Sequence, residues 1–211
     1  MAKIDLLFYM LLMFFLISPV IQGETPKPIW AQSVEEIANK VNRVRAGADL
    51  TPKEWPGGKK VAVSLSFDVD TEPVWMGFQG QSSPSYMSRG EYGARAGMPR
   101  IMELLNKHNI PATFFIPALS MELHPEVVPS IQENPRNEIG FHSYAHENPM
   151  TLTAEQERAT YAKAMKIFIK HTGQKPTGFR SAAWDLTEST IDIVQEMGFL
   201  YESSMMADDR P

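Results

Sequence analysis

Short apolar runs rich in β-branched and aromatic residues alternate with longer stretches of helical periodicity over most of the chain. The strand-like runs cover residues 61–67, 112–116, 138–141, 177–179 and 199–201. The clearest helical stretches between them cover residues 154–170, with Thr153 as the N-cap and Gln156 three residues on, and residues 187–198. This alternation predicts an α/β fold with a parallel sheet or a (β/α) barrel.

Two acidic residues stand at the end of the first strand-like run. Ligands of such folds bind outside the carboxyl ends of the strands, so polar residues that directly follow strands are candidate site residues. Asp68 and Asp70 are two positions apart and share one side of an extended chain. Two like charges this close resist simultaneous ionisation unless a cation lies beside them. The alternative, a pair of solvated loop acids, stays open for this motif alone.

Two histidines and an arginine follow later strand-like runs. His142 and His146 are spaced so that a helical turn would place both imidazoles on one face, where they could hold one ion. One carboxylate with two imidazoles suits Zn²⁺ or another first-row ion and leaves positions open for water and substrate. A non-haem iron oxygenase uses the same ligand types, but its expected scaffold is an antiparallel barrel. Arg180 could orient a nearby carboxylate and keep it ionised.

The N-terminal segment has the pattern of an export signal. Lys3 precedes residues 6–21, which are apolar except for Ser18 and Pro19. We expect residues 1–23 to be a signal peptide or, if uncleaved, an anchor, with residues 6–21 as the only contact with a membrane. The protein is then secreted, periplasmic or anchored outside the cytoplasm.

The rest of the chain divides into a preface and one catalytic domain. Residues 24–58 predict a linker and a helix that Ser33 caps with Glu36 three residues on, and residues 59–211 predict the catalytic domain. Three glycines without a phosphate-loop pattern are interpreted as turn residues, namely Gly90, Gly93 and Gly97.

Composition narrows the chemistry further. The 211 residues include 20 Lys and Arg against 25 Asp and Glu, for a net charge of -5. Because no basic excess is available to neutralise a phosphate backbone, nucleic acid is not an expected partner. The chain has no cysteine, which excludes disulfides, thiolate-bound metals and a thiol nucleophile. Any metal must therefore be held by His, Asp and Glu.

Three motifs together resemble a known family. Ser66-Phe-Asp-Val-Asp70, His142-Ser-x-x-His146 and Arg180-x-x-x-Trp184 are similar, in this order, to the first three motifs of the polysaccharide deacetylases of the NodB-homology group. Residues 88–95 also resemble a branch that includes peptidoglycan deacetylases and allantoinase-like imide hydrolases. The resemblance implies a distorted (β/α) barrel and metal-dependent hydrolysis of amide bonds in an N-acetylated, peptidoglycan-like or chitin-like glycan.

The resemblance also implies a role for each site residue. Asp70, His142 and His146 would bind the divalent metal, with Zn expected first and Co, Ni, Mn or Fe as alternatives. Asp68 would be the general base, and Arg180 would orient it. Trp184 would help to form the wall of the substrate groove.

The sequence differs from the family pattern at several positions, and these differences change what we expect of the barrel and of its turnover. Val69 separates acids that are adjacent in many members, and Ala182 stands where a proline is usual. Members continue to a Leu-x-His motif that supplies a general acid, whereas no histidine follows His171 here. We therefore expect a barrel truncated at its C-terminus, with poor turnover and with Asp208 or Asp209 as a remnant of the fourth motif.

Three functions remain open from the sequence. The first is an exported, metal-dependent glycan deacetylase. The second is a hydrolase of a small cyclic amide or imide. The third is a non-catalytic, truncated homologue that binds glycan or is tethered to a membrane. The sequence does not specify the oligomeric state.

Overall fold

The computed structural model describes residues 27–44 and 52–206. The expected signal or anchor at residues 1–23 lies outside the described residues, as do Asp208 and Asp209. Within the described ranges, no helix combines the length and the apolar character that crossing a membrane requires. The chain divides into two compact units, residues 1–47 and residues 48–211.

The first unit contains a short helical segment and one α-helix. The 3-10 turn η1 (Ile29–Ala31) precedes α1 (Val34–Asn42). The Ser33 hydroxyl accepts a hydrogen bond from the Glu36 backbone N–H (3.1 Å), and the Glu36 carboxylate accepts one from the Ser33 N–H (2.6 Å). Each side chain satisfies a donor that the first helical turn leaves without an internal partner. The predicted capping box is confirmed.

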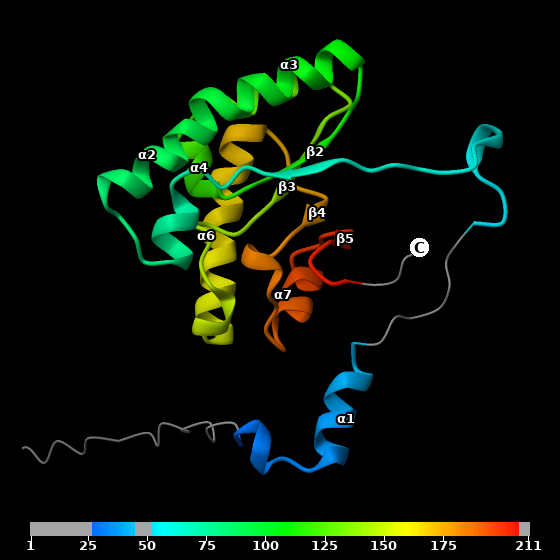
Figure 1. The fold of residues 1–211 in the computed structure, drawn as a ribbon, viewed down its shortest axis with the longest axis vertical. Helices are drawn as coiled ribbons and strands as arrows, with labels where there is room; N and C mark the ends of the chain where they lie inside the picture. The colour runs from blue at the N-terminus through cyan, green and yellow to red at the C-terminus, as the bar shows by residue number, and fades with distance from the viewer. Residues whose placement is uncertain (1–26, 45–51, 207–211) are drawn as a thin grey trace, which may run out of the picture. The chain divides into compact units, whose positions relative to one another are not determined.

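A five-stranded, all-parallel sheet organises the second unit (Figure 1). Its strands run in the order β1-β2-β3-β4-β5, so neighbours in sequence are neighbours in the sheet. Asp68 lies opposite Phe115, and Phe141 lies opposite both Ile116 and Phe179, which brings the carboxyl ends of four strands to one edge. The predicted parallel α/β architecture is confirmed. The strands are β1 (Ser66–Asp68), β2 (Thr113–Ile116), β3 (Glu138–Phe141), β4 (Gly178–Phe179) and β5 (Tyr201–Glu202).

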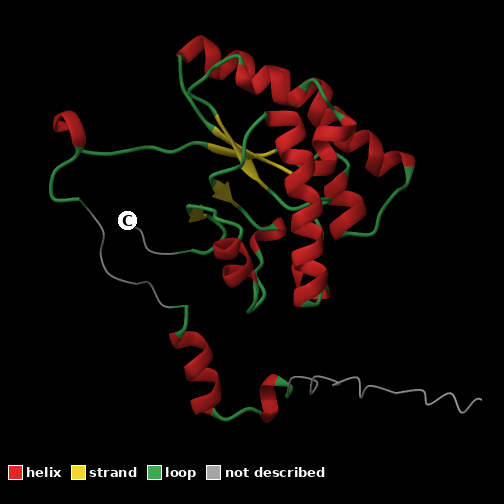
Figure 2. Cartoon of the chain, turned by 180° about the vertical axis from the view of Figure 1, so that it is seen from behind, coloured by secondary structure: helices red, strands yellow, loops and turns green. Residues whose placement is uncertain are grey.

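In Figure 2, the α-helices of this unit lie above, to the right of and below the strands. The two helices expected from periodicity are present as α6 and α7, and Thr153 caps α6 together with Gln156 as predicted. The α-helices are α2 (Pro84–Tyr92), α3 (Met98–His108), α4 (Ala118–Leu123), α5 (Val127–Gln132), α6 (Ala154–Thr172) and α7 (Thr190–Glu196). The 3-10 and π-helical segments are η2 (Pro56–Gly58), η3 (Val74–Phe78), η4 (Gly93–Gly97), η5 (Pro149–Thr151) and η6 (Ala182–Trp184).

The interpretation of three glycines as turn residues is wrong. Gly90 lies in α2, and Gly93 and Gly97 bound the π-helical segment η4, so a single helical run continues from α2 to α3. A Cβ at Gly90 would lie 2.3 Å from the backbone nitrogen of Glu72. Gly90 therefore allows this helix to pack directly on the chain that follows β1.

The expected first strand is too long. Residues 61–65 are not strand, and Val61 and Val63 are 69% and 79% exposed. The Thr113 N–H donates to the Leu65 carbonyl (3.0 Å), which is where pairing with β2 begins. Because β2 starts at Thr113, the residues before Leu65 have no adjacent described strand with which to pair.

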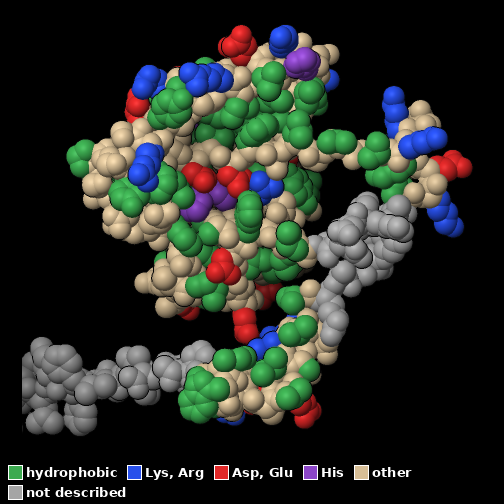
Figure 3. All heavy atoms as spheres, in the orientation of Figure 1, with side chains coloured by type: hydrophobic (Ala, Val, Ile, Leu, Met, Phe, Trp, Pro, Cys, Tyr) green, Lys and Arg blue, Asp and Glu red, His purple; other side chains and the backbone are tan. Residues whose placement is uncertain are grey.

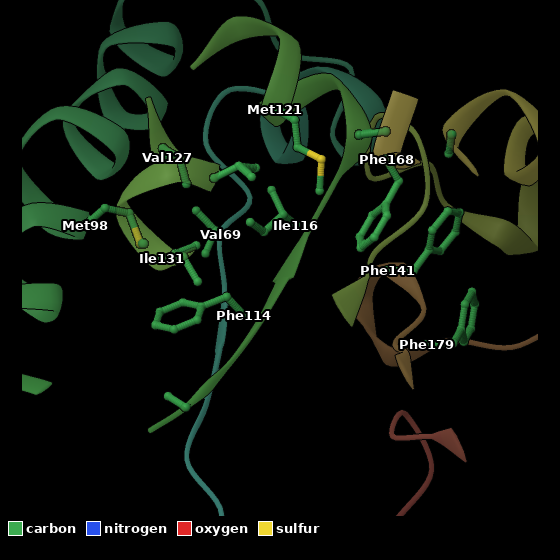
Figure 4. Close-up of a cluster of buried hydrophobic side chains, with 14 of the residues drawn as sticks. Val69, Met98, Phe114, Ile116, Met121, Val127, Ile131, Phe141, Phe168 and Phe179 are labelled. Atoms are coloured by element: carbon green, nitrogen blue, oxygen red, sulfur yellow. The ribbon is translucent and has the colours of Figure 1, made fainter. Parts of the chain in front are cut away.

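The hydrophobic core fills the space between the sheet and its helices (Figure 4). Phe141 is fully buried at the centre of one half, with its ring centroid 6.0 Å from that of Phe179 and 5.8 Å from that of Tyr161. In the other half, Phe114 packs under Met98 and Ile131 from the helices. Close packing on this face fixes the strands, and with them the residues at their carboxyl ends.

Two adjacent leucines in α3 test this description of the core. Leu105 is 5% exposed and Leu104 is 58% exposed. We expect Leu105→Ala to lower the free energy of unfolding by about 2–5 kcal/mol because it leaves a cavity. Leu104→Ala should change it by less than about 0.5 kcal/mol. Urea denaturation followed by circular dichroism measures both values, and equal effects would contradict the assignment of α3 faces.

Candidate metal centre

Three predicted ligands come together at the carboxyl edge of the sheet. Asp70 follows β1, and His142 and His146 follow β3. The Nε2 atom of His142 lies 3.4 Å from Asp70 Oδ1, and Nε2 of His146 lies 3.6 Å from Asp70 Oδ2. One ligand atom from each residue lies within 4.8 Å of the others. Histidine and acidic side chains gather on this face of the molecule (Figure 3).

The hydrogen bonds of His142 show that a cation fits between these residues. Nδ1 of His142 lies 2.7 Å from the carbonyl oxygen of Arg180, which can only accept, so Nδ1 carries the hydrogen. In the neutral ring, Nε2 is then an acceptor that faces another acceptor, Asp70 Oδ1. Both atoms are buried without a hydrogen-bond partner. A metal ion would satisfy both at once, and the Arg180 carbonyl would fix the ring orientation.

The electrostatic surroundings of Asp70 and His146 favour the protonation states in which these side chains bind metal. Burial works to raise the pKa of Asp70, but the neighbouring imidazoles of His142 and His146 and the guanidinium of Arg180 outweigh it and hold this pKa below its usual range. Burial lowers the pKa of His146. A carboxylate and a neutral imidazole are the protonation states in which these side chains bind metal.

A turn, and not a helix, pairs the two imidazoles. The expectation of a helical turn from His142 to His146 is wrong, because Ser143 (φ 60°) and His146 (φ 56°) have left-handed backbone conformations. The ring centroids are nevertheless 5.0 Å apart. The first N–H groups of α4 stabilise the turn: Ala118 donates to the Ser143 carbonyl (3.1 Å) and Leu119 to the Tyr144 carbonyl (2.8 Å).

The same short helix also holds the segment that carries Asp70. The Ser120 hydroxyl donates to the Asp70 carbonyl oxygen (2.8 Å), and the Thr71 hydroxyl donates to the Ser120 oxygen (2.9 Å). Thr71 has a positive φ of 49°, which is unusual for a β-branched residue. Sequence reasoning missed Ser120, whose only signal is its place three residues after Pro117, just beyond a predicted strand.

A glycine in η3 lies against the histidine turn. A Cβ on Gly77 would lie 1.8 Å from the carbonyl oxygen of Ala145, the residue before His146. Only glycine permits this approach of two backbones. No motif marks Gly77, because the contact joins segments that are far apart in the sequence.

Asp68, the other acid of the first motif, has different partners from Asp70. Nη1 of Arg180 donates to Asp68 Oδ1 (2.6 Å), and Nε1 of Trp184 donates to Oδ2 (3.2 Å). The structure therefore places Arg180 beside Asp68, as expected. Trp184 is 61% exposed, and its hydrogen bond to Asp68 was not anticipated.

Arg180 is itself fixed on several sides. Its guanidinium donates to the hydroxyls of Ser66 and Ser203 (both 3.0 Å). The same group lies over the ring of Phe115, 4.1 Å from the centroid. A guanidinium held in this way fixes the position of the Asp68 carboxylate at the sheet edge.

Comparison with known proteins gives consistent matches. A peptidoglycan deacetylase of Helicobacter pylori is 34% identical over 152 residues, which are 72% of this chain and 52% of that protein. A Mycobacterium smegmatis structure assigned to the polysaccharide deacetylases is 32% identical, with a TM-score of 0.68, and the match covers 77% of this chain and 57% of that one. An allantoinase structure is 27% identical with a TM-score of 0.67, over 76% and 59% of the two chains.

The matched region contains the whole candidate site. The chain spans about half the length of the Helicobacter pylori relative and under two thirds of each of these two solved chains. Residues 58–201 match the family model for polysaccharide deacetylase. This region includes β1 to β4 and the first residue of β5, together with the Asp70–His142–His146 cluster and the Asp68–Arg180 pair. On these grounds, the chain belongs to the polysaccharide deacetylase family.

Proposed function

We propose that this protein is a metal-dependent hydrolase that removes N-acetyl groups from a glycan outside the cytoplasm. The observation that carries the proposal is the pair of buried acceptors, His142 Nε2 and Asp70 Oδ1, that face each other across 3.4 Å beside a separately held carboxylate, Asp68. Two acids without a catalytic role would not need to be held by different partners when they are only two residues apart.

Asp70, His142 and His146 would hold the metal, for which we propose Zn²⁺. Two imidazoles and one carboxylate are a ligand set that Zn²⁺ accepts in catalytic sites, and Co, Ni, Mn or Fe could replace it. When bound, such an ion polarises an acyl oxygen and lowers the pKa of water towards about 7.

Asp68 supplies the proton transfers. Its carboxylate is the base that accepts a proton from the attacking water, and Arg180 and Trp184 hold it in position through both oxygens. The leaving nitrogen must then gain a proton. Once protonated, Asp68 can return this proton to the leaving nitrogen.

The substrate class rests on similarity and on the surface beside the site. The Helicobacter pylori relative is a peptidoglycan deacetylase. The exposed Trp184 ring is suited to contact a sugar face. The signal-like residues 1–23 accord with a substrate outside the cytoplasm.

A second candidate function is hydrolysis of a small cyclic amide or imide. The observation that favours it is the similarity to the allantoinase, at nearly the same TM-score as the Mycobacterium smegmatis structure. Both reactions break a carbon–nitrogen bond of an acyl group, so the same acid, base and ligand residues would serve either substrate.

A substitution of the proposed ligand Asp70 tests metal binding. We expect Asp70→Asn to weaken Zn²⁺ binding by at least about 100-fold, because it removes an anionic ligand and not only an outer partner of one. Asp192→Asn removes an exposed carboxylate on α7 and should have no effect. Competition titration with a chromophoric chelator measures both affinities, and equal values would refute the site.

The close contact at Gly77 gives an independent test. Gly77→Ala places a methyl group against the Ala145 carbonyl and should displace the turn that carries His146. We expect Zn²⁺ affinity to fall by about 10-fold or more. Gly93→Ala, in a helical position with open space around the new Cβ, is the matched control. Circular dichroism verifies folding, and unchanged affinity in a folded Gly77→Ala protein would contradict the proposed role.

A substitution of Asp68 distinguishes an effect on catalysis from an effect on metal binding. We expect the zinc-loaded chain to release acetate from N-acetylglucosamine oligomers, and Asp68→Asn to reduce the rate by about 10²–10⁴-fold. Zn²⁺ affinity should stay within a few-fold because Asp68 is not a ligand. Enzymatic detection of acetate measures the rate. Hydrolysis of a cyclic imide without acetate release would select the second function, and equal rates for both proteins would remove Asp68 from the mechanism.

A further inference from the structure

A cavity of about 320 Å³ adjoins the candidate metal centre. Its lining includes Asp68 and Asp70, and it continues to Val74, Trp75 and Met98. The volume equals the share of about ten water molecules at about 30 Å³ each, and it lies at the lower end of the range for ligand pockets. This is far more room than the two carbons of an acetyl group need.

Arg89 from α2 also lines this cavity. Its guanidinium carbon lies 4.8 Å from the ring centroid of Tyr86 and 5.6 Å from that of Trp75, and these two rings are 5.2 Å apart. Cation–π contact with two rings restricts the guanidinium without neutralising its charge. Arg89 therefore brings a positioned positive charge to the cavity.

The acids near Arg89 are engaged elsewhere. Glu91 on the same helix pairs with Arg95, and Glu72 lies 2.7 Å from the Nε2 atom of His124. Across the described part of the chain, no carboxylate forms an ion pair with Arg89. Arg180 differs, because its charge is balanced directly by Asp68 (2.6 Å).

The position of Arg89 relative to the metal centre is fixed by its neighbour. Gly90 packs so closely on the chain after β1 that an added Cβ would lie 2.3 Å from the Glu72 nitrogen and 2.6 Å from the Thr71 carbonyl carbon. The helix that carries Arg89 is thus seated on the segment that carries Asp70. A ligand in the cavity lies next to both groups.

We propose that this cavity is a specificity subsite, in which Arg89 binds a carboxylate on the sugar adjacent to the one that is deacetylated. The inference rests on the proposed function and deepens it, because it selects an anionic N-acetylated glycan over a neutral, chitin-like one. Trp75, Val74 and Met98 supply apolar contacts for the body of that sugar, and the guanidinium pairs with its carboxylate.

The test uses two matched substrates and three proteins. The substrates are an N-acetylated oligosaccharide with a carboxylate on alternate sugars and the same oligosaccharide with each carboxylate converted to a neutral methyl amide. The proteins are the unaltered chain, Arg89→Met and the control Arg100→Met, which removes an exposed charge from α3 outside the cavity lining. Acetate release by the zinc-loaded proteins gives kcat/KM for each substrate.

We expect the unaltered chain and Arg100→Met to prefer the carboxylated substrate by about tenfold. Arg89→Met should reduce that ratio to about one, and Arg89→Lys should restore part of it. A ratio near one in the unaltered chain, or an equal ratio in Arg89→Met, would overturn the subsite.

Binding without turnover separates this inference from the proposed function. Calorimetry of the metal-free proteins with the same two oligosaccharides should show the same Arg89-dependent preference. If this preference is present but no acetate is released from either substrate, the subsite stands and the deacetylase function fails. If acetate is released without any preference in rate or binding, the function stands and the subsite fails. Absence of binding to both oligosaccharides would also overturn the subsite.

Discussion

The structure depends on two buried lone pairs that face each other at the candidate metal centre. With its hydrogen on Nδ1, the neutral ring of His142 presents Nε2 as an acceptor to Asp70 Oδ1, and these two buried atoms lie 3.4 Å apart. Such an arrangement is unfavourable unless a cation compensates it, because each buried polar atom loses water without gaining a partner. The surrounding backbone holds it nonetheless, with left-handed conformations at Thr71, Ser143 and His146 that cost about 1–3 kcal/mol each.

The six-residue helix α4 stabilises these strained backbone conformations. Its first N–H groups bind the carbonyls of the histidine turn, and Ser120 binds the carbonyl of Asp70. One element thus holds ligands that come from the ends of two different strands. Because α4 packs into the core through Met121, the rigidity of the core extends to the position of the candidate metal ligands.

Two carboxylates of one short motif have different environments. Asp70 faces imidazoles, whereas both oxygens of Asp68 accept hydrogen bonds from Arg180 and Trp184. They are two residues apart in the sequence, but their partners come from the chain after β3 and from the chain after β4. Tertiary structure therefore gives the two acids separate environments, an arrangement that acid–base sites commonly use.

The sequence allowed the sheet and the meeting of the site residues to be predicted, because both follow from period and position. Polar residues after parallel strands must lie at one edge, so Asp70, His142 and Arg180 were expected near one another. The local structure of the histidine turn was predicted wrongly, since spacing alone does not distinguish a helix from a left-handed turn. Ser120, Gly77 and Gly90 act through contacts between distant segments, and no local pattern reveals such contacts.

The exposed residues ahead of β1 have a consequence for how the protein behaves in solution. Val61 and Val63 lie in an unpaired, extended stretch that leads into an edge strand of the described sheet. Extended apolar edges recruit further strands, and nearby lysines oppose this by mutual repulsion between copies. Lys59 and Lys60 precede the stretch and are exposed. Salt screens such repulsion beyond about 10 Å at 0.1 M, so added salt weakens this protection of the edge.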